Sequence, residues 1–254
     1  MNLNIHNVSL SINGRLIVKD VSITVNPGEV VGLMGPNGAG KTTTFNLAVG
    51  NIKPDKGEIS MNGKNITNLP LPFRSRLGLG YLTQEASIFR DLTVKDNIDL
   101  ALQNSSYSRA AIRNRREQLI NEFNLNNIVD NYGYQLSGGE RRRCEIARAL
   151  SVGSKGPKYL LLDEPFAGID PLAVNDLKSL ILKLSNNGVG ILITDHNVRE
   201  TLLITDKSYV LSEGKILSYG SSNELADNPI VKRYYLGDDF KLWNPSQNKL
   251  KLYS

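Results

Sequence analysis

The sequence is poor in cysteine and lacks any long hydrophobic run, and each absence excludes a class of protein. Its 254 residues include one cysteine, Cys144, which excludes an internal disulfide framework and fits a reducing compartment. No apolar run approaches the ~18–20 residues that a membrane-spanning helix needs. Residues 1–12 alternate polar and apolar side chains, which predicts a strand and not a secretion signal. The net charge of +5 leaves nucleic acid, an anionic membrane surface and nucleotide phosphates open as partners.

Short apolar stretches alternate with helical patterns along much of the chain. Residues 28–34, 158–163 and 188–194 are rich in Val, Leu and Ile, which is typical of strands buried on both faces of a parallel sheet. Residues 171–185 have a helical pattern that opens with Pro171, a residue favoured in the first turn of a helix. This alternation predicts a doubly wound α/β core.

The pattern changes between about residues 90 and 155, where three helical segments follow one another without a convincing strand. We interpret this stretch as a helical insertion into the α/β core. The final residues are polar and irregular, which predicts a loosely held tail. We therefore expect a single domain over 1–237, composed of an α/β core at 1–89 and 156–220, the helical insertion at 90–155 and a C-terminal helical part at 221–237, followed by a tail at 238–254.

A glycine-rich motif follows the apolar run at 28–34 and precedes a helical stretch. This strand–loop–helix context is the one that a phosphate-binding loop requires, and it makes a chance glycine-rich turn a poor alternative. The backbone amides and the helix N-terminus would face the phosphates, Lys41 would reach the β- and γ-phosphates, and the Thr42 hydroxyl would bind Mg²⁺. The expected nucleotide-binding residues are Gly35, Pro36, Asn37, Gly38, Ala39, Gly40, Lys41, Thr42 and Thr43.

A second motif ends the apolar run at 158–163 with two acids. Asp163 would lie at the carboxyl edge of the sheet beside the phosphate loop, where it would hold Mg²⁺ through water. Glu164 would orient and polarise the attacking water, a role that typically contributes ~10²–10⁴-fold. Taken alone, Asp-Glu-Pro after a strand is more often a turn and helix start, and the first motif is what favours the catalytic interpretation.

A third motif, Leu136-Ser137-Gly138-Gly139-Glu140, opens a helix inside the predicted insertion. A second anion-binding helix start so far along the chain is explained if another phosphate comes to it. Together with Gln84 after a strand and His196 after another, this ordered set resembles the ABC ATPase family. The resemblance implies a P-loop NTPase core of the ABC ATPase type, with an N-terminal antiparallel β region and an inserted helical subdomain.

The resemblance also implies a head-to-tail homodimer with ATP sandwiched between the two copies. One copy of each motif per chain requires a partner, and the simplest partner is a second copy of the chain. Hydrolysis would remove the γ-phosphate and let the pair open. The implied roles are Glu164, His196 and Gln84 as catalytic residues, Thr42, Gln84 and Asp163 as Mg²⁺ ligands, Ser137, Gly138 and Gly139 as ATP contacts in trans, and Asp170 as an interface residue.

Five longer segments resemble one family within the ABC ATPases, the ATP-binding subunit of the lipopolysaccharide export system of Gram-negative bacteria. The resemblance implies a homodimer on the cytoplasmic face of the inner membrane, beneath two different transmembrane permease subunits. Lipopolysaccharide would be the cargo of that complex without binding this chain directly, and we expect no nucleic-acid partner. The segments are 81–90, 136–143, 163–171, 194–200 and 231–240.

The resemblance further implies a groove that receives the permease, formed by Ser87, Ile88, Phe89 and Arg90 beside Gln84. Plain core packing is the alternative for Ile88 and Phe89, because an apolar socket and a core use the same residue types.

Two other functions remain open at this point. One is an ATPase subunit of a branched-chain amino-acid importer, and the other is a soluble ABC protein of DNA repair or translation. Soluble ABC proteins usually carry coiled-coil, zinc or duplicated cassettes, and the sequence shows none of these.

Two details of the sequence call for their own interpretation. No Phe, Tyr or Trp precedes Phe45, and Ile12 takes the place where many family members stack an aromatic ring on adenine. We therefore predict weaker adenine binding and weaker discrimination against GTP, by analogy with base stacking. The run Arg141–Arg143 is interpreted as a solvated helix face in preference to a phosphate-steering patch.

Overall fold

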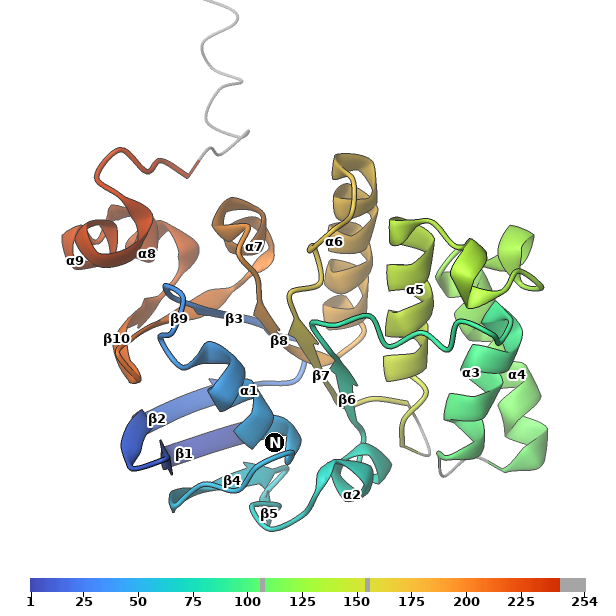
Figure 1. Ribbon diagram of the computed structural model, residues 1–254, viewed down its shortest axis with the longest axis horizontal. Helices are drawn as coiled ribbons and strands as arrows, with labels where there is room; N and C mark the ends of the chain where they lie inside the picture. Colours follow the sequence, from blue (N-terminus) through green and yellow to red (C-terminus); the bar gives the residue numbers. More distant parts are fainter. Residues whose placement is uncertain (106–107, 154–155, 243–254) are drawn as a thin grey trace, which may run out of the picture.

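Two β-sheets organise the chain, and helix α1 packs against both of them (Figure 1). The computed structural model describes residues 1–105, 108–153 and 156–242. The smaller sheet is antiparallel where its strands pair, with the order β2-β1-β4-β5. Its strands are β1 (Leu3–Ile12), β2 (Arg15–Val25), β4 (Lys56–Met61) and β5 (Lys64–Asn65).

The larger sheet has the order β10-β9-β3-β8-β7-β6 and is parallel from β9 to β6, while β10 pairs antiparallel with β9. Every residue of β3, β7 and β8 is buried, as the continuous apolar runs predicted. The strands are β3 (Val30–Met34), β6 (Leu79–Leu82), β7 (Tyr159–Asp163), β8 (Gly190–Thr194), β9 (Lys207–Ser212) and β10 (Lys215–Gly220).

Helices cover both faces of this sheet because successive strand residues point to opposite sides. Leu160 and Leu162 pack in one core cluster with α6 and the helices of the 94–149 region. Tyr159 and Leu161 pack in a second cluster with α1 and the antiparallel sheet. The predicted α/β class is thereby confirmed. The helices are α1 (Lys41–Val49), α2 (Leu71–Arg76), α3 (Val94–Gln103), α4 (Arg109–Glu122), α5 (Gly138–Ala149), α6 (Pro171–Asn186), α7 (Val198–Ile204), α8 (Ser222–Asp227) and α9 (Pro229–Val231).

The described residues between β6 and β7 form helices and turns, and α3, α4 and α5 lie together to one side of the sheet (Figure 1). The 3₁₀ turns η1 (Asn126–Ile128) and η2 (Gly133–Gln135) connect α4 to α5. The domain limits near 90, 155 and 237 stay predictions. Among the described residues, no helix is both long and apolar enough to cross a membrane.

The C-terminal part folds back onto the larger sheet. A π-helical turn, η3 (Lys232–Leu236), follows α9, and a small core cluster joins these turns to Met34 of β3. Phe240 and Leu242, from the first residues of the expected tail, pack against that cluster. The remainder of the expected tail, 243–254, lies outside the described residues.

Candidate nucleotide-binding and catalytic site

The loop between β3 and α1 has a backbone that requires glycine. Gly35 has φ 144°, and a Cβ built there would lie 2.2 Å from the carbonyl oxygen of Leu211. Gly40 precedes α1 with φ 101°, a left-handed conformation that glycine adopts without strain. The loop therefore passes close under the β9–β10 turn and leaves the N-terminus of α1 free to face an anion.

Lys41 is the first residue of α1 and closes over this loop. Its Nζ donates to the carbonyl oxygens of Gly35 at 2.6 Å and Pro36 at 3.0 Å. Burial lowers the pKa of Lys41, and the nearby carboxylates of Glu164 and Asp163 oppose that shift. The ammonium thus lies at the mouth of the loop, where a phosphate oxygen is a stronger acceptor than a carbonyl.

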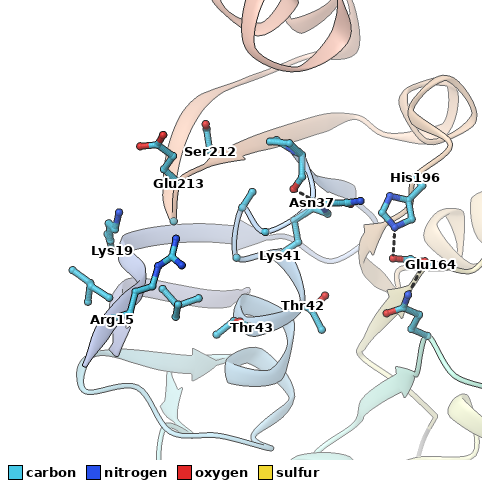
Figure 2. A pocket seen from close by; sticks show the side chains of 18 residues that line it. Arg15, Lys19, Asn37, Lys41, Thr42, Thr43, Glu164, His196, Ser212 and Glu213 are labelled. Carbon is cyan, nitrogen blue, oxygen red and sulfur yellow. Dashed lines mark hydrogen bonds and ion pairs between the residues drawn. The ribbon is translucent and has the colours of Figure 1, made fainter. Parts of the chain in front are cut away.

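Glu164 connects the ends of three neighbouring strands. Its Oε1 lies 2.8 Å from Nε2 of His196, and its Oε2 accepts from Nε2 of Gln84 at 3.0 Å. Figure 2 shows Glu164 and His196 facing the side of the cavity that holds Lys41 and Thr42. Gln84 follows β6, Glu164 follows β7 and His196 follows β8, so the parallel sheet brings three residues distant in sequence to one edge.

Asp163, at the end of β7, has the chemistry of a cation ligand. Its side chain is 2% exposed, and Oδ1 finds no hydrogen-bond partner among the described residues. Burial, reinforced by Glu164, raises the pKa of Asp163 to about 6. An unpartnered buried carboxylate oxygen fits a hard cation such as Mg²⁺, which prefers oxygen ligands. Thr42 and Gln84, which line the cavity, offer further oxygen atoms.

A cavity of about 960 Å³ extends from these residues across the phosphate loop to the edge of the antiparallel sheet (Figure 2). All of the expected phosphate-loop residues from Pro36 to Thr43 line it, as do the three catalytic candidates. Gly35 and Asp163 are not among the lining residues. The lining residues are Arg15, Leu16, Ile17, Lys19, Pro36, Asn37, Gly38, Ala39, Gly40, Lys41, Thr42, Thr43, Gln84, Glu164, His196, Ser212, Glu213 and Gly214.

Two turns at the far end of the cavity were missed by the sequence analysis. One is the β1–β2 hairpin, whose strand β2 carries Arg15 and Lys19, and the other is the β9–β10 turn with Ser212 and Glu213 (Figure 2). Nothing in the sequence relates these turns, because about two hundred residues separate them. In the structure they are tied together by the hydrogen bond from Lys19 N to Gly214 O at 2.8 Å. Ile12, the position expected to face adenine, does not line the cavity and instead pairs with Arg15 across the β1–β2 hairpin.

The Ser137–Gly139 motif lies at the start of α5 and does not line this cavity. Ser137 is exposed and caps the helix, accepting from Glu140 N while Glu140 accepts from Ser137 N. A Cβ on Gly138 would lie 3.0 Å from the carbonyl oxygen of Gly168, and one on Gly139 would lie 2.9 Å from Ala173. The chain therefore holds this helix start apart from its own phosphate loop, and any role of the helix start in trans stays a prediction.

Asp170 has a role within the chain that the sequence analysis did not anticipate. It is the N-cap of α6, and its Oδ1 accepts from the amides of Leu172 and Ala173, both at 3.0 Å. The hydrogen bond from the Ala173 amide, with smaller contributions from other groups, lowers the pKa of the Asp170 carboxyl. The side chain is exposed beside the Ser137–Gly139 motif, and its expected place in an interface is untested.

The four expected groove residues divide into two kinds of environment. Ile88 packs partly against the core cluster, while Phe89 is 45% exposed with the guanidinium of Arg148 lying 4.5 Å from its ring centroid. Ser87 offers its carbonyl to Arg148. Only Ile88 and Arg90 of the four line the neighbouring cavity of about 170 Å³, whose other lining residues are Ala86, Gly133, Tyr134, Leu136 and Arg141.

The run Arg141–Arg143 is not a uniformly solvated face, so that interpretation is wrong for Arg142. Arg142 is 5% exposed and uses its guanidinium to hold backbone carbonyls beneath the catalytic residues. A triplet of equal charges gives no sign in sequence of which member points inward, because the helix rotates about 100° between neighbours.

The comparisons with known proteins agree with this geometry. The ABC transporter family matches residues 18–167. The lipopolysaccharide export system ATP-binding protein LptB of Escherichia coli strain K12 is 50% identical over 237 residues, covering 93% of this chain and 97% of that protein. The protein of the same name from Acidithiobacillus ferridurans is 51% identical over 228 residues, covering 90% of this chain and 93% of that protein.

Solved structures show the same fold. An ATP-binding cassette of an ABC transporter in its ADP conformation superposes with a TM-score of 0.83 at 27% identity, covering 94% of this chain and all of the other. The phosphate loop, the Ser137–Gly139 helix start and the two acids at the end of β7 thus occur in one fold and in this order. The chain belongs to the ABC transporter family of ATP-binding, ATP-hydrolysing subunits.

Proposed function

We propose that this chain hydrolyses ATP to drive lipopolysaccharide export, as a homodimer bound to two permease subunits on the cytoplasmic face of the inner membrane. The observation that carries the proposal is about 50% identity over nine-tenths of the chain to proteins named for that export system. The aligned stretch covers 90% and 93% of the chain in these two comparisons, so it extends well beyond the ATPase motifs.

The chemistry follows from the cavity. Glu164 accepts from Gln84 and faces His196, so its carboxylate is positioned to hold and polarise a water molecule in line with a γ-phosphate. Lys41 and the amides of the phosphate loop would bind the phosphates. Thr42, Gln84 and Asp163 would hold Mg²⁺, which when bound neutralises charge on the phosphate oxygens.

The homodimer follows from the separation of the two phosphate motifs. Ser137, Gly138 and Gly139 form a capped helix start whose cap, Ser137, is exposed, away from the cavity that contains the phosphate loop of the same chain. A second copy turned head to tail would bring this helix start to ATP, and a symmetric pair would complete two sites at once. Asp170 lies beside the motif and would contact the opposing copy.

The test is affinity purification of the chain from mildly solubilised membranes of its own cell, with Glu164→Gln to retain ATP. Two copies of the chain with two different permease subunits and co-purifying lipopolysaccharide are expected. Recovery with amino-acid permeases would keep the ATPase and overturn the cargo. If no membrane protein is recovered, the transport function itself is wrong.

The importer alternative is not favoured, because relatives at about 50% identity are named for lipopolysaccharide export.

A second variant for the purification, Phe89→Ala, tests the groove itself. It removes an exposed groove side chain that lies outside the cavity, so loss of the permease with retained ATP binding is the expected result.

A further inference from the structure

A single buried guanidinium holds the backbone of the catalytic loops. Arg142 on α5 donates from Nη2 to the carbonyl oxygens of Asp163 at 3.1 Å and Glu164 at 2.6 Å. Its Nε donates to Pro165 O at 3.2 Å, and Nη1 donates to Thr83 O at 3.1 Å. The backbone of Thr83, which precedes Gln84, and the backbones of Asp163 and Glu164 are therefore all bound to one side chain.

The remaining donor of Arg142 goes to Glu145, one turn further along α5. Nη1 of Arg142 lies 3.0 Å from Oε2 of Glu145, and the two side chains are 6% and 1% exposed. The other oxygen of Glu145 accepts from the amides of Ser87 at 2.7 Å and Ile88 at 3.2 Å. An unbroken series of hydrogen bonds thus leads from the backbone of Glu164 to the segment that we assign to the permease groove.

The arrangement is more specific than stability alone would require. A buried ion pair is often replaceable by apolar side chains without loss of stability, because desolvation offsets much of the attraction. Here every one of the five guanidinium N–H groups has an acceptor, and four of these acceptors are carbonyls from two different loops. A planar guanidinium fixes the directions of its acceptors, so it sets the position of one loop relative to the other.

We infer that Arg142 and Glu145 are positioning residues that couple the catalytic loops to the segment 87–90. The helix that carries both residues begins with the Ser137–Gly139 motif. A rigid shift of α5 on engagement of that motif would move Glu164, Gln84 and the groove backbone together. The assignment of 87–90 to a permease rests on the proposed function, but the coupling within the chain does not.

The double variant Arg142→Met with Glu145→Gln tests the coupling. It removes the arginine without leaving a buried carboxylate unpaired, and the glutamine oxygen still accepts from Ser87 and Ile88. The matched control is Arg113→Met with Glu117→Gln, which makes the same changes in an exposed pair on α4. A second variant, Arg142→Lys, keeps the charge opposite Glu145 but supplies too few donors for the carbonyls.

The readout is hydrogen exchange of the full chain with and without the Mg²⁺ complex of a non-hydrolysable ATP analogue. In the parent and the control, the analogue should change exchange of the Ser87 and Ile88 amides about threefold or more. In the double variant and in Arg142→Lys that change should disappear, while the dissociation constant for the analogue stays within about threefold. The turnover number should fall about tenfold or more in both, which separates positioning from binding.

Three results would overturn the inference. The first is that the parent transmits no change to Ser87 and Ile88, and the second is that the double variant transmits it undiminished. The third is that binding, melting temperature and turnover fall together in Arg142→Lys, which is the pattern of a purely structural role. The experiment uses the chain without a permease, so its failure is distinguishable from a failure of the purification that tests the export function.

Discussion

The two ends of the nucleotide cavity are built in different ways. At the phosphate end, the site depends on backbone and on side chains held by other parts of the protein, such as Glu164 between Gln84 and His196. At the far end, the lining residues that the structure describes come from the β1–β2 hairpin and the β9–β10 turn. They are charged, aliphatic or small, with Arg15 and Glu213 among them, and none is aromatic. The phosphate end is thus held in a fixed arrangement by contacts among its own residues, whereas the far end presents side chains that can be exchanged without changing the backbone.

The largest expected effect is at the phosphate end. The variant Glu164→Gln keeps the shape of the side chain but removes the negative charge that polarises water, so turnover should fall by about 10²–10⁴-fold. ATP binding should be retained, because the phosphate loop is untouched. Phosphate release and equilibrium binding of ATP, measured on the same preparation, check both statements.

The control for this variant is Glu117→Gln, the same substitution on the exposed surface of α4. It should leave turnover unchanged within about twofold. Equal losses of ATP binding and turnover in Glu164→Gln would contradict the division between binding loop and catalytic carboxylate.

The second effect concerns the helix that follows the phosphate loop, which a buried arginine holds at its C-terminal end. Arg74 is fully buried and donates from Nη1 to the carbonyl oxygens of Leu47 at 2.9 Å and Ala48 at 2.6 Å, in the last turn of α1. Burial lowers the pKa of Arg74 to about 10, so it stays charged at neutral pH and complements the negative end of the helix dipole. Arg74→Met should lower the free energy of unfolding by about 3 kcal/mol, since it leaves these carbonyls unpaired.

Urea unfolding measures this loss. The control is Arg76→Met, an exposed arginine of the same helix that lies over the ring of Phe73, for which a change below about 0.5 kcal/mol is expected. Equal effects of the two variants would show that the carbonyls of α1 do not depend on Arg74.

The same division separates what the sequence could predict from what it could not. The phosphate loop and the two acids at the end of β7 were predictable because a short contiguous motif already contains the backbone geometry and the reactive groups. Arg15 and Glu213 were not, because the two turns meet only through tertiary structure. Arg142 was misread, because hydrophobic burial is visible in sequence whereas the burial of a fully hydrogen-bonded charge is not.

The third prediction uses the raised pKa of Asp163, about 6 in the folded chain against ~3.9 in the unfolded chain. Below about pH 4 both states are protonated and the side chain costs nothing. From pH 4 to pH 6 the unfolded chain is increasingly ionised, so the free energy of unfolding is lowered, and above pH 6 the loss is complete. Without nucleotide and Mg²⁺, Asp163→Asn should therefore stabilise the chain by about 3 kcal/mol at pH 8 and far less at pH 4.

Urea unfolding of parent and variant at the two pH values gives the comparison directly. A gain of equal size at both values would mean that the burial of the charge is not its cause. The prediction sharpens the contrast between the two ends, since it assigns to the phosphate end a stability cost that a bound cation would relieve.

The smallest effect is expected at the far end. Ile12 is 45% exposed and pairs with Arg15, a residue of the cavity edge, across the hairpin. An aromatic ring at this position would therefore reach toward the cavity without disturbing the core. Ile12→Tyr should tighten ATP binding by about 1 kcal/mol, the lower limit of base stacking on an aromatic ring, and Ile12→Leu should not. Equilibrium titration with ATP and GTP measures both affinity and discrimination. If Ile12→Tyr binds ATP no more tightly than Ile12→Leu, base recognition rests on the two turns alone.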